Sequence, residues 1–481
     1  MKVELSEDIV VQPEITAQTI DMAYEQWRSF IARYEKLRDY YVGKQDFDPD
    51  LHGQGQNRIV SNHCRYITDV LVGYQYGNEP RYTTSDGDTV GEAIIDLFNK
   101  QDKWNVDTSI GEDMSIFGRA LELVYTPEDK DEPSSIPIDP LHGFVAYAGD
   151  VERDSVFGCV VFEYENDRKQ KICRLYIYDR ANVSVWESDT VDKKPRLWRM
   201  IDTPKPHGFG RVPLIEYKNN RRAMSDFESV MELQDAYNAS ISDRQDNEDA
   251  FTQATLVLSG EVMGMTEDEV IDSRKKLRKI GVLHLGDDAS AEFLVKQVDE
   301  SGVQVALDAL SSDLHKLAYV PDLSDEQFAG NASGVAMAYK LFGTDQIVSK
   351  KQSQVQKGFT RRCKLYDFRM NNPTMDPNYT PMADIENMVI TFNLNAPQDL
   401  SYVASAVTQL VGSQILSRQT ARAIISVIPD PEKEGELVDE EAETDIERAR
   451  APFDADEVDD RRKEHPEEEL EPRNDDEDPE E

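Results

Sequence analysis

The chain has 481 residues, of which 94 are acidic and 53 basic, for a formal net charge of −41 at pH 7. This length exceeds one compact core and predicts about two to four domains, or one extended subunit of several parts. The charge excludes proteins that hold nucleic acid on a broad basic face. Residues 430–481 contain 26 acidic and 7 basic residues, nearly half of the acidic excess, and the remaining body is acidic as well.

The cysteines and the N-terminus indicate the compartment. Cys64, Cys159, Cys173 and Cys363 are far apart and form no CxxC pair, which argues against a zinc site and against a disulfide framework. We expect free, buried thiols in a reducing cytosol. The first residues are acidic and polar, unlike a signal peptide, and no stretch approaches the roughly 18 apolar residues of a spanning helix. The sequence therefore predicts a protein made and used in a cytoplasm, without a membrane partner.

The first 217 residues predict helices followed by a small sheet. Apolar residues at helical spacing, with terminal glycines after the last two, predict helices over 17–41, 60–76 and 106–117. Runs rich in β-branched and aromatic residues predict strands at 120–125, three times between 144 and 188, and at 207–217. The fold class that this order predicts is α+β.

A helix, a small module and a second helix follow. Ser225 and Glu228 have the spacing of a capping box, which predicts a helix over 226–251. The second half of this helix is polar on all sides, as in a helix that bridges through solvent or packs against copies of itself. Apolar residues at spacings of four and three then predict a helix over 303–317 that packs lengthwise on another. Between the two helices, short β runs at 255–258, 281–285 and 293–298 predict a small α/β module.

The last third begins at Pro321, which ends the second helix. A polar loop over 322–331 leads into a long basic helix over 333–370, with Gly343 and Gly358 as its expected bend points. Further elements are expected as a strand at 388–394 and helices over 400–415 and 420–428.

Signatures of catalysis are missing from the sequence. No GxxxxGK[ST] phosphate loop, HExxH pair or GxSxG elbow occurs, so nucleotide hydrolysis, metalloprotease and serine-hydrolase chemistry lack their minimal parts. His63 and Cys64 lie in a helical stretch without a partner at ligand spacing, and we interpret both as structural. We therefore expect no cofactor and no enzymatic activity.

Two charge clusters leave alternatives open. The acidic cluster comprises Asp243, Asp246, Glu248 and Asp249. It either holds magnesium for two-metal phosphodiester cleavage or forms a solvated helix face or a contact between subunits. The basic cluster comprises Arg274, Lys275, Lys276, Arg278 and Lys279. It either grips phosphate, lies on a charged helix surface, or docks an acidic partner.

Five segments carry a recognisable pattern in a fixed order. They are NRIVSNHCRYITDVLVGYQYGNEP from Asn57, HGFGRVPLIEYKNN from His207, DFESVMELQDAYNASISDRQDNEDAF from Asp226, YVPDLSDEQFAGNASGVAMAYKLFG from Tyr319, and SRQTARAIISVIPDPEKE from Ser417. Together they resemble the portal proteins, or head-to-tail connectors, of tailed double-stranded-DNA bacteriophages, in the siphophage subgroup with a long stem. The resemblance covers about residues 15–445 and contains no catalytic signature.

The resemblance implies a homo-oligomeric ring of about twelve subunits. DNA enters and leaves the virus head through its channel. The implied parts are a wing at 1–225, stem helices at 226–251 and 302–319, a clip at 252–301, a tunnel loop at 320–334, a kinked helix and wing return at 335–398, a crown at 399–445, and an acidic disordered tail at 446–481. The implied partners are double-stranded DNA, the packaging motor (the large terminase subunit), a major capsid or scaffold protein, and neck or adaptor proteins. The implied location is the capsid vertex of the virion, reached after assembly in the host cytoplasm.

The resemblance also implies which residues face the DNA and the motor. The tunnel loop and the helix after it contribute Asp322, Asp325, Glu326, Asn331 and Lys340. An acidic loop repels phosphate and favours sliding over gripping. Lys340 is the expected basic contact to DNA, with pairing to a neighbouring subunit's carboxylate as the alternative. The basic cluster at 274–279 is the expected docking surface for the motor.

Two other functions and the role of the tail stay open at this point. A metal-dependent nucleic-acid-processing enzyme predicts cleavage by the purified protein, and a scaffold or adaptor without a channel predicts small oligomers. The tail beyond Arg450 has the composition of a disordered segment. It either keeps the subunit soluble or competes with DNA for basic partners.

Overall fold

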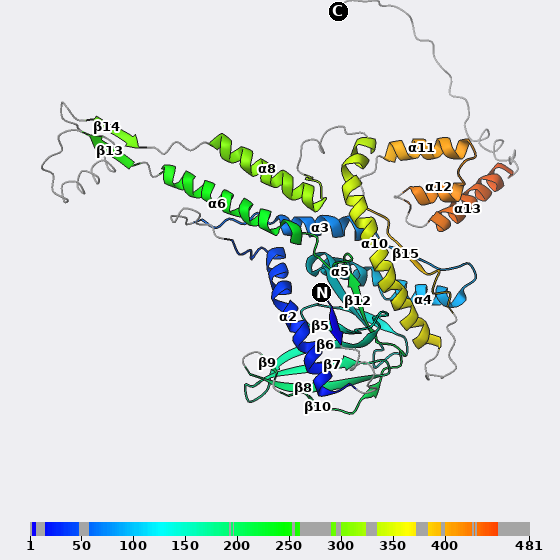
Figure 1. The fold of residues 1–481 in the computed structure, drawn as a ribbon. Helices are drawn as coiled ribbons and strands as arrows, with labels where there is room; N and C mark the ends of the chain where they lie inside the picture. The colour runs from blue at the N-terminus through cyan, green and yellow to red at the C-terminus, as the bar shows by residue number, and fades with distance from the viewer. Residues whose placement is uncertain are drawn as a thin grey trace, which may run out of the picture. The chain divides into compact units, whose positions relative to one another are not determined.

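The computed structural model describes residues 2–5, 15–47, 57–191, 194–195, 197–252, 255–259, 290–294, 300–323, 334–371, 383–395, 400–425, 428 and 431–450. The chain divides into two compact units, Met1–Pro397 and Gln398–Glu481. Figure 1 shows their elements as a ribbon. Helices and strands are mixed within the first unit, which confirms the α+β prediction.

The largest sheet of the first unit has the strand order β1-β5-β6-β7-β8-β10, and β9 and β11 also pair with β8. Its strands are β1 (Val3–Leu5), β5 (Gly143–Ala148), β6 (Ser155–Glu165), β7 (Lys171–Tyr178), β8 (Asn182–Val191), β9 (Lys194–Pro195), β10 (Arg199–Met200) and β11 (Lys205–Pro206). The pairs from β5 through β8 are antiparallel, whereas β1 runs parallel to β5. The three β-rich runs of the sequence are confirmed as β6, β7 and β8.

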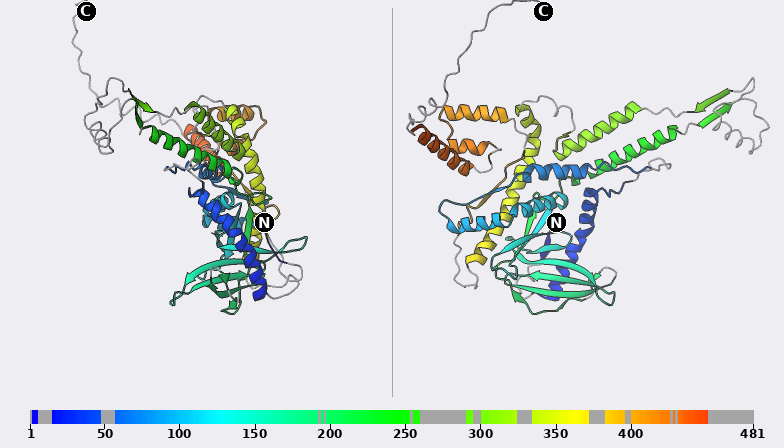
Figure 2. Two further views of the ribbon diagram at one scale, coloured as in Figure 1. Left: turned by 60° about the vertical axis from the view of Figure 1, so that its left-hand side comes forward. Right: turned by 180° about the vertical axis from the view of Figure 1, so that it is seen from behind.

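Helix α2 (Ala17–Tyr41) packs along this sheet and has the bounds predicted from its periodicity. Figures 1 and 2 show its N-terminal half running along the sheet. Ile20, Tyr24 and Trp27 of this half are buried in one core with residues of β5 to β8. Its C-terminal half belongs to a second core together with helices α3 and α5. There Tyr40 is buried, whereas the sequence pattern placed Tyr41 on the buried face.

A second layer surrounds a three-stranded antiparallel sheet of order β12-β3-β4. Its strands are β3 (Arg119–Tyr125), β4 (Ser134–Ile138) and β12 (Leu214–Lys218). The neighbouring helices are α3 (His63–Tyr76), α4 (Thr89–Lys100) and α5 (Lys103–Phe117). Helix α5 ends as predicted at Gly118, whose φ of 80° suits a residue without a side chain. The expected start of α3 at residue 60 is wrong, because Asn62 caps the helix by accepting the Arg65 N–H at 3.2 Å. The sequence reading also missed α4.

Helix α10 (Gly334–Asn371) connects the layers and is one helix of 38 residues, close to the predicted bounds. Its C-terminal half packs on β12, on α4, and on the small sheet of β2 (Arg81–Thr83) with β15 (Val389–Thr391). Gly358, expected as a bend point, lies against the ring of Tyr217, where any side chain would collide. A requirement for close packing therefore explains this glycine.

A buried charge network fixes α10 on the second layer. Arg362, with a side chain 1% exposed, donates to both oxygens of Glu122 at 2.8 and 3.0 Å and to Asp107 at 2.5 Å. Ser135 and Tyr217 also donate to Glu122, at 2.5 and 2.6 Å. Burial alone would raise the pKa of Glu122, but the Arg362 guanidinium and these hydrogen bonds hold it below the ordinary value. The network thus joins α5, β3, β4, β12 and α10 through polar contacts in an apolar surrounding.

His207 provides a test of the pH dependence of stability. Its Nε2 donates to the Asp179 carbonyl at 3.0 Å, and its Nδ1 accepts the Phe209 N–H at 3.2 Å, so these contacts require the neutral ring. Burial lowers the pKa of His207, so the unfolded chain takes up a proton first as the pH falls. This stability is therefore present at neutral pH and is lost below about pH 6.5.

We expect His207→Gln to show a smaller loss of unfolding free energy than wild type between about pH 7 and about pH 5.5. Urea unfolding curves at the two pH values measure it. His142→Gln is the matched control, because the His142 side chain is 63% exposed. An unchanged pH dependence in His207→Gln, or an equal change in both variants, would contradict the expectation.

The helix-module-helix segment begins with the turn η1 (Glu228–Val230) and α6 (Met231–Thr252) and closes with α8 (Glu300–Ala318). Between them, β13 (Thr255–Ser259) and β14 (Ser290–Leu294) form an antiparallel pair. Helices α6 and α8 pack side by side, as Figures 1 and 2 show. The predicted strand at 255–258 is confirmed, the strand expected at 293–298 starts earlier, and residues 281–285 lie outside the described residues.

The second unit contains α11 (Leu400–Gly412), α12 (Arg418–Ile424) and α13 (Pro431–Arg450). The first two correspond to the helices expected at 400–415 and 420–428, and both are shorter. Helix α13 extends through residues 446–450, which the sequence reading had assigned to a disordered tail, so that boundary is corrected. The sequence did not predict this helix because charged residues occupy most of its positions, although its few apolar residues include Leu437 and Val438.

Candidate functional site: the helix pair and the loop root

The polar side of α6 binds an extended segment of the same chain, residues 57–63. Four side chains of α6, spaced one helical turn apart, bind this segment. Each accepts one backbone N–H, and the four donors are alternate residues of the segment. The pairs are Asp246 with Asn57, Ser242 with Ile59, Asn238 with Ser61, and Gln234 with His63, at 3.0 to 3.1 Å. We call these four side chains the polar ladder.

Matching repeat lengths explain the polar ladder. Four residues of α-helix rise about 6 Å, and two residues of extended chain rise about 6.6 Å. The two repeats therefore stay in step over four contacts. Gln234, Asn238 and Ser242 are completely buried. The sequence correctly found these residues polar, but only the fold shows that their partner is a backbone.

Two residues of the acidic cluster of α6, Asp246 and Asp249, bind this segment, and the other two bind residues of α6 itself. The Asn57 amide donates to Asp246 at 2.8 Å and to Asp249 at 2.7 Å. Asp243 accepts from Asn247 at 3.1 Å, and Glu248 pairs with Arg244 at 3.3 Å. Among the residues that the structure describes, no group of three or more histidine, cysteine or acidic side chains is placed to hold a metal ion.

The start of α6 is fixed to both α2 and α10. Glu228 accepts the expected N–H of Ser225 at 3.1 Å, and Arg33 binds its carboxylate with two hydrogen bonds of 2.8 and 2.6 Å. The Ser225 hydroxyl donates to the Ser115 carbonyl at 2.7 Å and accepts the N–H of Phe227 at 3.4 Å, one residue before the capping-box position. Lys351 of α10 forms a buried ion pair with Asp226. Any movement of α6 at this end therefore breaks contacts to α10.

We use the name loop root for Tyr319–Leu323, the residues between the end of α8 and residues 324–333. Tyr319 has a φ of 58°, an uncommon conformation for a residue with a side chain, so the chain reverses here. Tyr66 accepts the Leu323 N–H at 2.9 Å and donates to the Pro321 carbonyl at 3.0 Å. The Thr344 hydroxyl of α10 donates to the Tyr319 carbonyl at 2.8 Å. The loop root is thereby fixed to both α3 and α10.

Two histidines lie where α3, α6 and α8 meet the loop root. The rings of His63 and His315 are 5.8 Å apart. Burial lowers the pKa of His63, and His315 contributes in the same direction. His63 contacts Gln234 and the Ser61 carbonyl through Nδ1, at 3.2 and 3.1 Å. Cys64 beside it is buried, as are the other three cysteines, and none is in a disulfide.

Large apolar side chains are exposed around the loop root. Tyr339 is 80% and Phe342 61% exposed on α10, and Tyr319 is 54% and Leu323 49% exposed on the root itself. Tyr319 lies next to Gly343 of α10, which directly follows Phe342 and is one helical turn beyond Tyr339. We call the four exposed side chains the apolar patch. The predicted apolar seam of α8 is buried at Leu307 and Leu314 but not at Leu317, which is 51% exposed. A patch of this kind marks a protein interface.

Two of the residues expected to face DNA lie in this region. Asp322, on the loop root, has a carboxylate 3.9 Å from the imidazole of His315. Lys340 is half-buried in the first turns of α10, between Tyr339 and Phe342 in sequence. Asp325, Glu326 and Asn331 lie outside the described residues, as does the basic cluster at 274–279.

Some features of the site had no signal that the sequence reading used. Tyr66, Thr344 and the polar ladder act through backbone groups of residues far away in sequence.

No helix of the described part has the length and apolar character needed to cross a membrane.

Two comparisons bear on the whole arrangement. A sequence model of the family described as phage portal protein, SPP1 Gp6-like, matches residues 22–448. A curated relative, the portal protein of Bacillus phage SPP1, is 23% identical over 420 residues, which cover 85% of this chain and 80% of the relative.

Proposed function

The chain belongs to the SPP1 Gp6-like family of phage portal proteins, and from this membership we infer its function as a structural, non-enzymatic component of the virion. It is a portal protein: it forms the channel through which DNA is packaged and ejected, and it docks the packaging motor. Its partners are further copies of itself in a ring, and capsid and packaging proteins. Its place is the capsid vertex.

We propose the finer assignments that the resemblance implied. The ring has about twelve subunits and assembles in the host cytoplasm. Helices α6 and α8 are the stem, the segment 252–301 between them is the clip, and residues 320–334 are the tunnel loop. The large terminase subunit docks at the basic cluster 274–279, the capsid or scaffold protein and the neck or adaptor proteins bind other surfaces, and residues 399–445 are the crown.

One observation carries this proposal: a paired helical stem whose second helix leads directly into a fixed loop root. The polar ladder, the Lys351 ion pair and the Tyr66 contacts give the loop a rigid base. A loop that touches moving DNA needs such a base, because force on the loop must not displace the stem. The apolar patch beside the root supplies the surface that a neighbouring copy would bury.

Negative-stain microscopy of the purified chain tests the assembly. We expect rings with a central hole wide enough for duplex DNA. Monomers or small oligomers without a hole would contradict the ring and favour the adaptor alternative.

Lys340 is the proposed basic contact to DNA, because it lies within the first two turns of the helix that follows the loop. We expect Lys340→Ala to lower the amount of DNA retained in filled heads and to weaken its dependence on salt, since each lost lysine removes about one phosphate contact. Retained DNA measured over a salt series checks this. Lys364→Ala, an exposed lysine far along the same helix, is the control. Equal retention in Lys340→Ala and wild type would assign Lys340 to a contact between subunits instead.

A further inference from the structure

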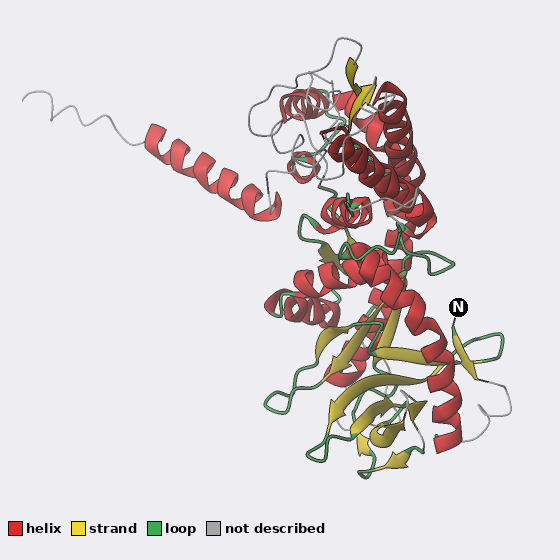
Figure 3. Cartoon of the chain, turned by 90° about the vertical axis from the view of Figure 1, so that its left-hand side faces the viewer, coloured by secondary structure: helices red, strands yellow, loops and turns green. Residues whose placement is uncertain are grey.

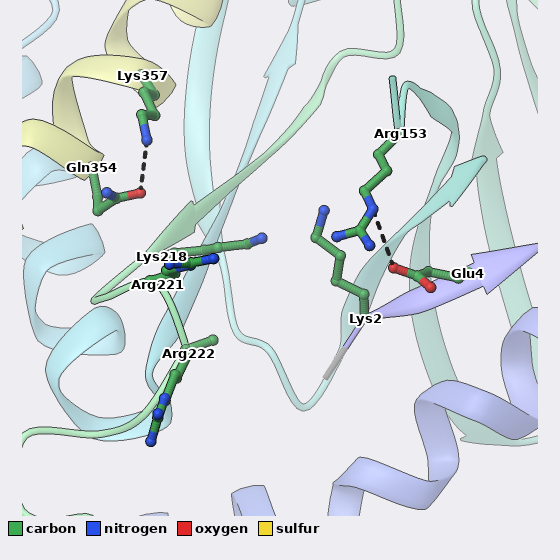
Figure 4. Close-up of a pocket in the computed structure, with 9 residues that line it drawn as sticks. Lys2, Glu4, Arg153, Lys218, Arg221, Arg222, Gln354 and Lys357 are labelled. Carbon is green, nitrogen blue, oxygen red and sulfur yellow. Dashed lines mark hydrogen bonds and ion pairs between the residues drawn. The ribbon is translucent and has the colours of Figure 1, made fainter. Parts of the chain in front are cut away.

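A cavity of about 670 Å³ in the first unit is lined mainly by cations. They come from four separate parts of the chain: the start of the N-terminal strand, the β5–β6 connection, the end of β12 with the turn after it, and α10. The cations are Lys2, Arg153, Lys218, Arg221, Arg222 and Lys357. Figure 4 shows Lys2 and Lys218 extending toward each other across it. We call this the basic cavity.

The basic cavity contrasts with the chain as a whole, whose net charge is −41. Among the described residues that line it, Glu4 is the only carboxylate, and it lies 3.9 Å from Arg153. Six cations therefore face one carboxylate. In a chain with almost twice as many acidic as basic residues, this gathering is not what random placement of side chains gives.

Lys218 is one of the partly buried cations of this cavity, with a side chain 24% exposed. Its nearest carboxylate, Glu216 at 4.0 Å, already accepts from Arg119 at 2.6 Å and from Tyr147 at 2.7 Å. Burial lowers the pKa of Lys218 to about 8, and Lys2 and Arg119 add to this while Glu216 opposes it. The carboxylate nearest to this ammonium group is thus shared with Arg119 and Tyr147, and an anion in the cavity would supply further negative charge.

We propose that the basic cavity binds a compact polyanion whose phosphate groups are adjacent, as in an oligophosphate chain or a stretch of nucleic-acid backbone. Guanidinium groups bind phosphate oxygens in pairs, and ammonium groups add point charges. Adjacent phosphates place several charges within one small volume. An extended acidic peptide places successive side chains on opposite faces of the chain, about 3.3 Å apart along it, so it brings fewer charges into the same cavity. The site is separate from the loop root and does not rest on the channel assignment.

Calorimetric titration of the full-length protein with pyrophosphate, at constant ionic strength set with chloride, tests the proposal. We expect saturable binding of one ligand per chain. Lys218→Gln and Arg221→Gln should each weaken it about tenfold, the effect of losing one charge-assisted hydrogen bond. Lys130→Gln, which removes an exposed cation between β3 and β4, should leave it unchanged. Because Arg221 is exposed, its variant folds without a buried substitution, and melting curves check all three proteins.

Proton uptake is a second readout. Binding raises the pKa of Lys218, so at a pH near 8 the wild-type protein should take up protons, seen as a binding enthalpy that depends on the buffer. Lys218→Gln should lose this uptake. A structural role of Lys218 alone would not produce it.

Titration with short duplex DNA distinguishes the sources of phosphate. Competition between DNA and pyrophosphate, lost in Lys218→Gln, assigns the site to the nucleic-acid backbone, whereas binding of pyrophosphate without competition assigns it to a free oligophosphate. Three results would overturn the proposal: no saturable binding, binding that both cavity variants leave intact, or tighter binding of a peptide with the sequence of residues 451–481 at the same residues.

Discussion

Replacing Arg362 by methionine is expected to lower the free energy of unfolding by about 3–5 kcal/mol, the cost of removing one partner from a buried ion pair. Glu122 and Asp107 would remain buried with Lys103 as their remaining cationic neighbour. The Lys103 ammonium donates to the Ser135 hydroxyl at 2.9 Å, whereas the Arg362 guanidinium donates to both carboxylates directly, so Lys103 does not replace its hydrogen bonds. Chemical unfolding curves measure the loss.

Two further variants separate charge from geometry at this position. Arg362→Lys keeps the charge but lacks the planar fork that reaches both carboxylates, so we expect an intermediate loss. Lys364→Met changes an exposed residue two positions along the same helix and should stay within about 0.5 kcal/mol of wild type. A loss below about 1 kcal/mol in Arg362→Met would mean that the apolar surroundings, not the network, hold α10 in place.

The same network predicts an acid limit of stability. Because the pKa of folded Glu122 is lowered, its contribution is present above the ordinary glutamate value of about 4.3 and is lost as the pH falls through the folded pKa. Arg362→Met should lose most of this component. The slope of unfolding free energy against pH in acid should therefore be shallower in the variant than in wild type.

The double variant Tyr339→Asp with Phe342→Asp is expected to abolish ring formation without unfolding the chain. The two side chains are 80% and 61% exposed, so the single chain loses little packing. In an assembly, burial of each aromatic side chain contributes about 1.5–3 kcal/mol. Loss of both should weaken each subunit contact at least about a hundredfold. Microscopy and native mass measurement would then find monomers with an unchanged melting temperature.

Val151→Asp serves as the control for a new surface charge, because Val151 is 99% exposed in a loop outside the apolar patch. It should leave the rings intact. Rings of normal size from the double variant would show that the patch is no subunit contact. Such a result would leave the family membership untouched and would overturn only the interface assigned to the patch.

A feature of this structure could be predicted from the sequence when the residues that determine it lie close together along the chain. Helix α2 has its predicted bounds because its apolar spacing, the Thr16 cap and the end at Val42 are all local. The β-rich runs appear as strands for the same reason. Helix α3 begins three residues later than predicted, because the polar ladder of α6, some 170 residues away, binds the non-helical residues up to Asn62 and the N–H of His63.

The functional site divides in the same way. The sequence predicted the long helix α10 and the paired helices α6 and α8. The resemblance supplied the portal function that the family match confirms. The sequence did not place Tyr66, Thr344 or Lys351 at the base of the loop, because their partners lie 25 to 255 residues away. The residues expected to contact DNA and the motor stay predictions.

The sequence by itself determined the class of this protein: an acidic α+β chain with segments of a portal subunit in order and no catalytic signature. Only the tertiary structure decided what its polar residues do. Hydrogen bonds and ion pairs depend on which segments meet, and periodicity reports only which face of a segment is buried. The fold brings together the partners on which the roles of these residues depend. This holds for the polar face of α6, for the buried Arg362 of α10 and for the six cations of the basic cavity.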